Sequence, residues 1–211
     1  MWYSEVVTTD YTTASVRDLL DAFASPDPLP GGGSAAALAA SLGVSLLTMV
    51  ASMSRTRTAN PAESLALREA AARLQPIREA LIALIEEDSR AYLAVIAAYR
   101  QPKDTDDQRA ARTEAIQNAV RWAIDVPLRT MRWGEQALRE ATPIVRVGNP
   151  NAVTDAIVGA RLLMTALESA GLNVDVNVPA VTDTAYARRA SEERQALEQS
   201  ARESLRAMPS H

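Results

Sequence analysis

Residues 29–54 read LPGGGSAAALAASLGVSLLTMVASMS and contain no charged side chain. A run of this length is long enough to cross a bilayer. Its hydroxyl residues, however, recur at helical spacing and would line one face of a helix: Ser41, Ser45, Thr48 and Ser52. Such a stripe among many alanines suits close packing against other helices inside a protein. We therefore predict a buried core helix over residues 34–53 rather than a transmembrane span.

The segments on either side of this run predict further helices. We expect these helices at about 15–24, 61–99, 105–145, 151–170 and 183–207, with loops rich in proline, glycine and asparagine between them. Pro61 suits the first turn of a helix, and Thr105 and Gln108 have the spacing of a capping box. Pro76 and Pro127 fall inside two long segments, so we expect them to kink or divide those helices.

The whole chain is predicted to be all-α, with a single domain over residues 1–211. Alanine and leucine recur throughout, Phe occurs once, and the 8 Gly and 11 Pro are clustered rather than evenly spaced. Only Val174, Val176 and Val178 alternate as a strand would, and they fit the end of a helix equally well. Gly171 is expected to cap the helix over residues 151–170. We find no internal repeat and no domain boundary.

The residue inventory limits the chemistry that the protein can perform. The chain has no cysteine, and its one histidine is His211, the last residue. Thiolate nucleophiles, histidine bases and Cys-rich or His-rich metal sites are therefore not expected. A net charge of −4 argues against a nucleic-acid partner. Met1–Asp10 lacks the basic start and apolar run of an export signal, so we expect a cytoplasmic protein.

Pro30-Gly31-Gly32-Gly33-Ser34 leads directly into the predicted core helix. Glycines allow a backbone to approach a ligand closely, and the free amides at a helix start attract anions or polar heterocycle edges. These residues are therefore candidates for substrate binding. The alternative is a flexible entry loop with Ser34 as an ordinary N-cap.

Glu86-Glu87-Asp88 interrupts an otherwise apolar helical segment. Three consecutive positions cover so much of a helix's circumference that at least one carboxylate should face the packed side. Burial would raise the pKa of that carboxyl, as acid–base chemistry near neutral pH requires. We expect Glu86 to belong to a solvated acidic face. Asp88 is the candidate for catalysis, and a share of that role for Glu87 stays open.

Two other segments carry candidate binding groups. Lys103 is the only lysine of the chain and lies in a proline-anchored loop, where it could bind a carboxylate or merely favour a helix end. Asn149, Asn151 and Asp155 gather amides and a carboxylate at a predicted helix start. These groups could read a heterocycle edge or could act only as a cap.

In four stretches the chain resembles the methenyltetrahydrofolate cyclohydrolases and the cyclodeaminase domain of formimidoyltransferase-cyclodeaminase. The similar stretches are residues 30–37, 85–103 (IEEDSRAYLAVIAAYRQPK), 105–128 (TDDQRAARTEAIQNAVRWAIDVPL) and 148–178 (GNPNAVTDAIVGARLLMTALESAGLNVDVNV). Four motifs in the same order are far more specific than any one of them. Leu29 and Tyr92 depart mildly from the family pattern, and Arg55 and Arg57 stand where lysines are common.

The resemblance implies a dimeric helical bundle of the cyclodeaminase type with long, proline-kinked helices. It implies that Asp88 is the catalytic carboxylate. It also implies that the glycine segment, Arg55, Lys103 and the asparagine-rich helix start contribute to a folate cleft. No prosthetic group or metal is implied, and a tetrahydrofolate derivative would be the substrate.

The function implied is hydrolysis of 5,10-methenyltetrahydrofolate to 10-formyltetrahydrofolate in one-carbon metabolism. The expectation of a cyclohydrolase rests on a stand-alone chain without the transferase domain that would supply a cyclodeaminase. One alternative is a formimidoyltetrahydrofolate cyclodeaminase, which would release ammonia. Another is a helical protein that binds folate or acts as a scaffold without catalysis.

Overall fold

The computed structural model describes residues 10–209, so Met1–Thr9 and His211, on which two sequence predictions rest, lie outside it. The helices of the described chain are α1 (Val16–Ala24), α2 (Gly32–Ala51), α3 (Pro61–Tyr99), α4 (Asp106–Val147), α5 (Val153–Asn177) and α6 (Thr184–Arg206). Short 3-10 helices span Pro150–Ala152 and Val178–Ala180. Since no strand occurs between residues 10 and 209, the prediction of an all-α fold is confirmed.

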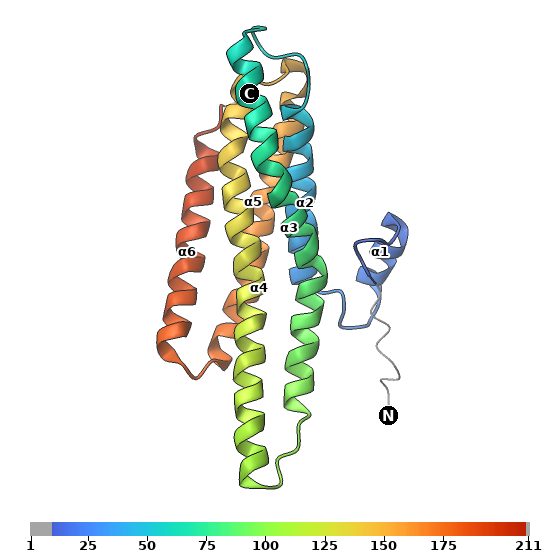
Figure 1. Ribbon diagram of the computed structural model, residues 1–211, viewed down its shortest axis with the longest axis vertical. Coiled ribbons are helices and arrows are strands. Elements are labelled where there is room, and N and C mark those ends of the chain that lie inside the picture. The colour runs from blue at the N-terminus through green and yellow to red at the C-terminus, as the bar shows by residue number, and fades with distance from the viewer. Residues whose placement is uncertain (1–9, 210–211) are drawn as a thin grey trace.

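Helices α2 to α6 form one elongated bundle (Figure 1). The long helices α3 and α4 pack against each other, and α2 and α5 form a second closely packed pair. Helix α6 covers one edge of the bundle against α4 and α5. Helix α1 stands beside the bundle near the point where α2 begins (Figure 1).

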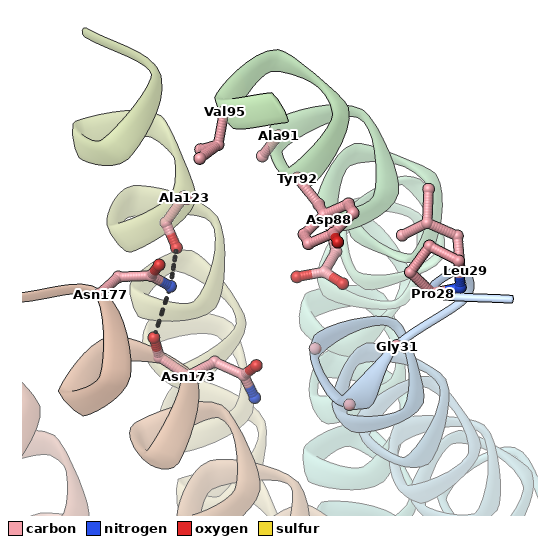
Figure 2. Close-up of a pocket in the computed structure, with 12 residues that line it drawn as sticks. Pro28, Leu29, Gly31, Asp88, Ala91, Tyr92, Val95, Ala123, Asn173 and Asn177 are labelled. Atoms are coloured by element: carbon pink, nitrogen blue, oxygen red, sulfur yellow. Dashed lines mark hydrogen bonds between the residues drawn. The ribbon is translucent and has the colours of Figure 1, made fainter. Parts of the chain in front are cut away.

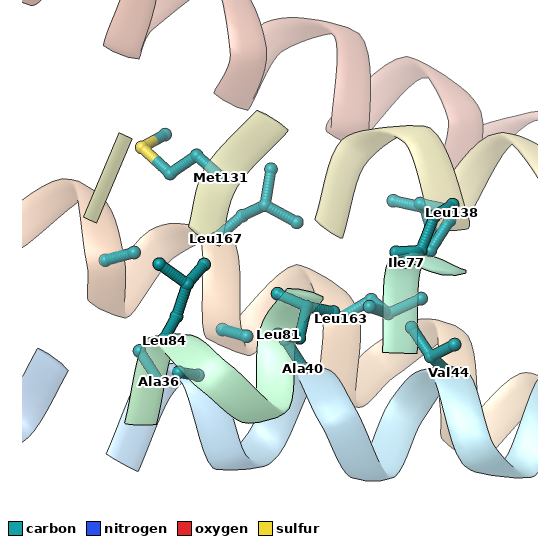
Figure 3. Close-up of a cluster of buried hydrophobic side chains, with 14 of the residues drawn as sticks. Ala36, Ala40, Val44, Ile77, Leu81, Leu84, Met131, Leu138, Leu163 and Leu167 are labelled. Atoms are coloured by element: carbon teal, nitrogen blue, oxygen red, sulfur yellow. The ribbon is translucent and has the colours of Figure 1, made fainter. Parts of the chain in front are cut away.

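The core of the bundle is built around α2, as its uncharged sequence predicts. Ala40 and Val44 of α2 are completely buried beside leucines from α3, α4 and α5 (Figure 3). Close approach of α2 and α5 depends on two glycines, because a Cβ on Gly43 would lie only 2.7 Å from the carbonyl oxygen of Gly159. Small residues thus let two helix backbones pack at a distance that larger side chains would prevent.

The hydroxyl stripe of α2 is satisfied within the protein. Ser41, Ser45 and Thr48 each donate a hydrogen bond to the carbonyl oxygen four residues earlier, at 2.7 to 2.8 Å. Arg78 of α3 also donates to Ser45 Oγ at 3.0 Å. By length and composition, α2 and the stretch Pro150–Ala180 could each cross a membrane, but 56% of the apolar window of α2 is already buried in the bundle. The prediction of a buried core helix is confirmed for α2.

Local capping signals predicted several helix starts correctly. Asn60 Oδ1 accepts a hydrogen bond from the amide of Ala62 at 2.9 Å, with Pro61 in the first turn. Thr105 and Gln108 form the predicted capping box. Helix α2 begins at Gly32, two residues earlier than the sequence suggested.

Three predicted interruptions do not occur. Helices α3 and α4 run without a break through Pro76 and Pro127, so division at these prolines was wrong. A cap at Gly171 was also wrong, because α5 continues to Asn177 and includes Val174 and Val176, while Val178 begins the 3-10 helix that follows. Gly171 instead makes room for Arg194 of α6, whose Nε would lie 3.0 Å from a Cβ at this position. Packing along each helix outweighs the local cost of one proline or glycine.

Candidate active site

A pocket of about 300 Å³ opens where the start of α2 meets α3, α4 and the end of α5 (Figure 2). One wall is the segment before and within the first turn of α2, and the facing wall is α5. The volume lies at the lower end of the range for small-molecule sites and suits a bicyclic head group better than a long ligand. The lining residues are Pro28, Leu29, Gly31, Gly32, Gly33, Asp88, Ala91, Tyr92, Val95, Ala123, Asn173 and Asn177.

Within residues 10–209, Asp88 is the only charged side chain that lines this pocket. Its Oδ2 accepts hydrogen bonds from the backbone amide of Ser34 at 2.9 Å and from the Ser34 hydroxyl at 3.1 Å. The N-cap of α2 is Gly31, which has no side chain to occupy the free amides of the first turn. The start of α2 therefore offers an amide and its positive dipole end to a carboxylate from α3.

Gly33 makes this arrangement possible. A Cβ at Gly33 would lie 2.0 Å from Asp88 Oδ1 and 2.5 Å from its carboxyl carbon, far closer than atoms can approach. Asp88 therefore rests directly on the backbone of α2. Both Ser34 donors bond to Oδ2, and Oδ1 lies beside Gly33 without a recorded hydrogen bond from the described residues.

Burial raises the pKa of Asp88 above the ordinary aspartate value of 3.8, and the Ser34 hydrogen bonds offset part of this rise. The direction matters for chemistry, because a carboxyl with a raised pKa accepts and returns protons closer to neutral pH. The site thus combines a desolvated acid with a fixed orientation and an adjacent cavity. These are the properties of a general acid–base group.

Ser34 lies behind Asp88 rather than in the pocket. Its side chain is completely buried, and its hydroxyl also donates to the carbonyl oxygen of Ile85 at 2.8 Å. The alternative of a flexible loop with Ser34 as N-cap was wrong, because the cap is Gly31 and Ser34 belongs to the first turn of α2. The geometry gives Ser34 a positioning role toward Asp88, while direct contact with substrate stays a prediction.

The neighbouring carboxylates have other partners. Glu87 Oε1 accepts from Arg129 Nη1 at 2.6 Å and from the Trp122 indole at 3.1 Å, which ties α3 to α4. Glu86 accepts from the backbone amide of Tyr11, so it joins the amino-terminal segment to α3 rather than standing on a free acidic face. The three consecutive carboxylates of α3 thus have different partners: Glu86 contacts the amino-terminal segment, Glu87 contacts α4, and Asp88 contacts the start of α2.

The predicted site residues fall into separate regions. Gly31, Gly32 and Gly33 line the pocket with Asp88, and Pro30 is buried next to them. Lys103 is exposed in the loop between α3 and α4.

The other predicted binding residues lie far from the pocket, beyond the carboxyl-terminal end of α2. At that end Arg57 donates its amide to the Val147 carbonyl at 2.9 Å, and Gly148 faces Val50. Arg55, Asn149, Asn151 and Asp155 belong to this end. Since α2 rises about 1.5 Å per residue, its two ends are separated by about 30 Å.

Sequence reasoning missed the wall formed by α5. Asn173 and Asn177 line the pocket opposite Asp88 (Figure 2). A signal was present, because two amides four residues apart in an apolar segment share one helical face. Only the packing of α5 against the start of α2 shows that this face lines the pocket. Among residues 10–209, no group of three or more acidic or histidine side chains is placed to hold a metal ion.

Comparison with known proteins places this fold and site in context. The sequence model of the formiminotransferase-cyclodeaminase family matches residues 15–196. The chain is 34% identical over 183 residues to a methenyltetrahydrofolate cyclohydrolase of Methylorubrum extorquens, covering 87% of this chain and 88% of that one. It is 31% identical over 173 residues to the formimidoyltransferase-cyclodeaminase of Rattus norvegicus, covering 82% of this chain but only 32% of that protein.

A solved structure has the same fold. The crystal structure of a formiminotetrahydrofolate cyclodeaminase from Thermotoga maritima superposes with a TM-score of 0.82 and covers 92% of this chain and 93% of that chain. Its sequence identity to this chain is 22%. The predicted helical bundle of the cyclodeaminase type is therefore confirmed as a fold.

Proposed function

The chain belongs to the formiminotransferase-cyclodeaminase family, and from this premise we propose that it is a methenyltetrahydrofolate cyclohydrolase, an enzyme that hydrolyses 5,10-methenyltetrahydrofolate to 10-formyltetrahydrofolate. The relative with that name matches this chain over nearly the whole length of both proteins. The observation that carries the proposal is Asp88, a partly buried carboxyl of raised pKa held against Gly33 at the edge of a pocket.

The first half of the reaction needs a proton acceptor. In the methenyl substrate a planar, positively charged amidinium carbon bridges two nitrogens and is already electrophilic. A water molecule attacks this carbon, and Asp88 Oδ1 takes one proton from the water as the new C–O bond forms. The product of this half is a neutral intermediate with a hydroxyl on a tetrahedral carbon. Asp88 is then protonated, a state that its burial favours.

The second half returns the proton. Asp88 protonates the departing ring nitrogen N5, the C–N5 bond breaks, and the hydroxyl releases its proton to solvent as the carbonyl forms. The formyl group remains on N10. One carboxyl acts first as base and then as acid, so no metal or histidine enters these steps. Ser34 and Gly33 keep Asp88 in place for both steps.

A formimidoyltetrahydrofolate cyclodeaminase is the second candidate function. The family match and the name of the rat relative support it. In that reaction N10 would attack the formimidoyl carbon on N5, and the same carboxyl would protonate the nitrogen that departs as ammonia when its C–N bond breaks. A folate-binding helical protein without catalysis is the third candidate, and it would leave the raised pKa of Asp88 without a chemical use.

The deciding experiment follows loss of methenyl absorbance and release of ammonia by the purified protein. We expect hydrolysis of the methenyl substrate without ammonia from the formimidoyl compound. Asp88→Asn should reduce kcat about 100-fold or more, since positioned acid–base groups contribute that much. Its melting temperature should not fall, because the substitution removes a charge that burial disfavours.

Glu87→Gln is the matched control, because it removes the adjacent carboxylate outside the pocket. It should lower the melting temperature by weakening the contact with Arg129 and leave kcat nearly unchanged. Full activity in Asp88→Asn would contradict the mechanism. Ammonia release alone would favour the cyclodeaminase, and no turnover of either substrate would favour the non-catalytic protein.

We further propose that the protein acts as a homodimer through an apolar face of α2 and α5. Leu42 is 52% exposed on α2 and Val158 is 48% exposed on α5. Leu172 and Val176, still more exposed, extend the face toward the end of α5 beside the pocket. Two-fold pairing across this face would be self-complementary. With antiparallel α2 helices it would bring the Arg55 and Asn149 end of one copy beside the pocket of the other.

Sedimentation analysis tests this dimer. Leu42→Glu should give a monomer, whereas Leu65→Glu, on α3 and also 52% exposed, should leave the dimer intact. A dimer unaffected by Leu42→Glu would contradict this interface. A cytoplasmic location and the absence of nucleic-acid and membrane partners stay predictions.

A further inference from the structure

The pocket wall opposite Asp88 presents two carboxamides, and their orientation is fixed by the backbone. Asn177 Nδ2 donates to the carbonyl oxygens of Asn173 at 2.8 Å and Ala123 at 3.3 Å (Figure 2). Asn173 Nδ2 donates to the carbonyl oxygen of Ser169 at 3.0 Å. Both N–H groups of the Asn177 amide and one N–H of the Asn173 amide are therefore directed at protein acceptors rather than at a ligand.

Reversal of either amide would be unfavourable. For Asn177 it would place Oδ1 against two carbonyl oxygens, and for Asn173 against one. The side-chain oxygens must therefore be the groups left over. Within the described residues neither Oδ1 accepts a hydrogen bond from the protein. Asn173 also lies beside the glycine segment, because a Cβ at Gly32 would be 3.8 Å from its Nδ2 and 4.0 Å from its Oδ1.

The polar side chains of the pocket are therefore dominated by acceptors. Among the described residues, Asp88 supplies a carboxylate, Asn173 and Asn177 supply carboxamide oxygens, and no basic side chain lines the cavity. An anion or a heterocycle edge made of lone pairs would be repelled by these oxygens, and only the Tyr92 hydroxyl and the backbone amides at the start of α2 could donate to it. A ligand with several N–H donors, or with a positive charge, would satisfy them.

We propose that Asn173 and Asn177 bind the N–H edge of a reduced pteridine and make the pocket selective for the tetrahydro oxidation state. The inference rests on the proposed function for the identity of the ligand. A tetrahydropteridine carries N–H at position 8, together with the donors of its pyrimidine ring. In an oxidised pteridine the same nitrogen is an acceptor. Oxidation therefore replaces a donor by a lone pair, which a wall of acceptor oxygens would reject.

Equilibrium binding of two ligands with the same tail tests this proposal. 5-Formyltetrahydrofolate represents the reduced ring and folic acid the oxidised ring. Wild-type protein should bind the reduced ligand at least tenfold more tightly, since one buried donor left without a partner changes affinity by about that factor. Asn173→Leu, similar in size but without an acceptor, should lose most of this preference.

Two further variants separate the acceptor from its neighbours. Asn118→Leu alters an exposed asparagine of α4 outside the pocket and should bind both ligands as the wild type does. Asn173→Ala, which adds no bulk and suits a helix, replaces Asn173→Leu if the latter fails to fold. Circular dichroism and melting temperature check the fold of each variant.

Three results would overturn the inference: equal affinity of the wild type for the two ligands, binding of neither, or an unchanged preference in Asn173→Leu or Asn173→Ala. Turnover of the methenyl substrate is measured on the same preparations. A wild type that prefers the reduced ligand but has no turnover would defeat the proposed enzyme and leave this inference standing. If the wild type turns over the methenyl substrate but Asn173→Leu or Asn173→Ala keeps the full preference for the reduced ligand, only this inference is defeated.

Discussion

The starts of α2 and α5 look alike in sequence but differ in structure. Both follow a segment rich in glycine, proline or asparagine and lead into an apolar helix. Before α5, Asn149 Oδ1 caps the short 3-10 helix Pro150–Ala152 by accepting from the amide of Asn151 at 3.0 Å, and the N-cap of α5 itself, Ala152, has no side-chain cap. At α2 the N-cap is a glycine without a side-chain cap, and the Ser34 amide bonds to Asp88 of another helix.

This difference shows what turns a helix start into a chemical site. A side-chain cap uses the free amides for the stability of its own helix. Without a cap, an amide remains available to a group that the fold brings in from elsewhere. Both α2 and α5 lack a side-chain cap at their own N-cap, but only the start of α2 receives a desolvated carboxyl from another helix beside a cavity, as the proposed acid–base chemistry requires.

The largest expected effect comes from filling the contact between α2 and Asp88. Gly33→Ala would place a Cβ 2.0 Å from Oδ1, and we expect kcat/KM to fall about 100-fold or more as Asp88 is displaced. Gly148→Ala is the matched variant before α5, since its Cβ would lie 2.5 Å from the Ile144 carbonyl oxygen. It should lower the melting temperature but leave kcat close to wild type. Equal losses of activity in both variants would remove the distinction between the two starts.

A smaller effect is expected from Ser34→Ala. The hydroxyl lowers the pKa of Asp88, so its removal should raise that pKa further and move the acidic limb of the kcat/KM profile to higher pH. We expect about a tenfold loss of activity near neutral pH, together with a loss of about 1 kcal/mol of stability, because the hydrogen bonds of the buried hydroxyl to Ile85 and Asp88 are removed. The pH–rate profile distinguishes positioning from a purely structural role. A loss of stability with an unmoved acidic limb would contradict the assignment.

How far the sequence could predict these features depends on the range of the interactions. Asn60 with Pro61, and Thr105 with Gln108, determine helix starts through neighbours in the chain, so they were predictable. The passage of α5 through Gly171 depends on Arg194 of α6, which lies far along the chain. Local rules therefore ended this helix too early.

The residues of the candidate site also differ in how far the sequence could predict them. Asp88 stood out because acidic residues interrupt an apolar helical segment, and the resemblance to a family singled it out. The signal from Asn173 and Asn177, two amides on one helical face, was weaker, because amides on a helix are also common on solvated faces. Their importance follows from the close contact of α2 and α5 at Gly43 and Gly159, which brings the end of α5 beside the start of α2.

Stability against pH gives a more modest test of the α2 start. The folded state raises the pKa of Asp88 above 3.8, so the neutral acid is favoured and deprotonation penalises folding. The wild type should therefore lose stability as pH rises from about 3.8 through the folded pKa, by about 1.4 kcal/mol for each unit of the shift. Asp88→Asn should lack this loss. The unfolding free energy of Asp88→Asn, measured by chemical denaturation, should exceed that of the wild type by an amount that grows across this pH range and then stays constant. A difference that does not change with pH would contradict a titrating carboxyl of raised pKa at this position.

The smallest effect is expected at the start of α5. Asn149→Ala removes the acceptor for the Asn151 amide and should cost about 1 kcal/mol in unfolding free energy, the usual value of a lost cap. The Asp88 pocket lies about 30 Å away along α2, so kcat should not change. The KM of Asn149→Ala tests the proposed dimer. If the Asn149 end of one copy lies beside the pocket of the other, the dimeric variant should have a higher KM than the dimeric wild type for a substrate with an extended tail. The same substitution in the monomeric Leu42→Glu background should then leave KM unaltered. A rise in both backgrounds would mean that the two helix starts communicate within one chain, and the contrast between them would need another explanation.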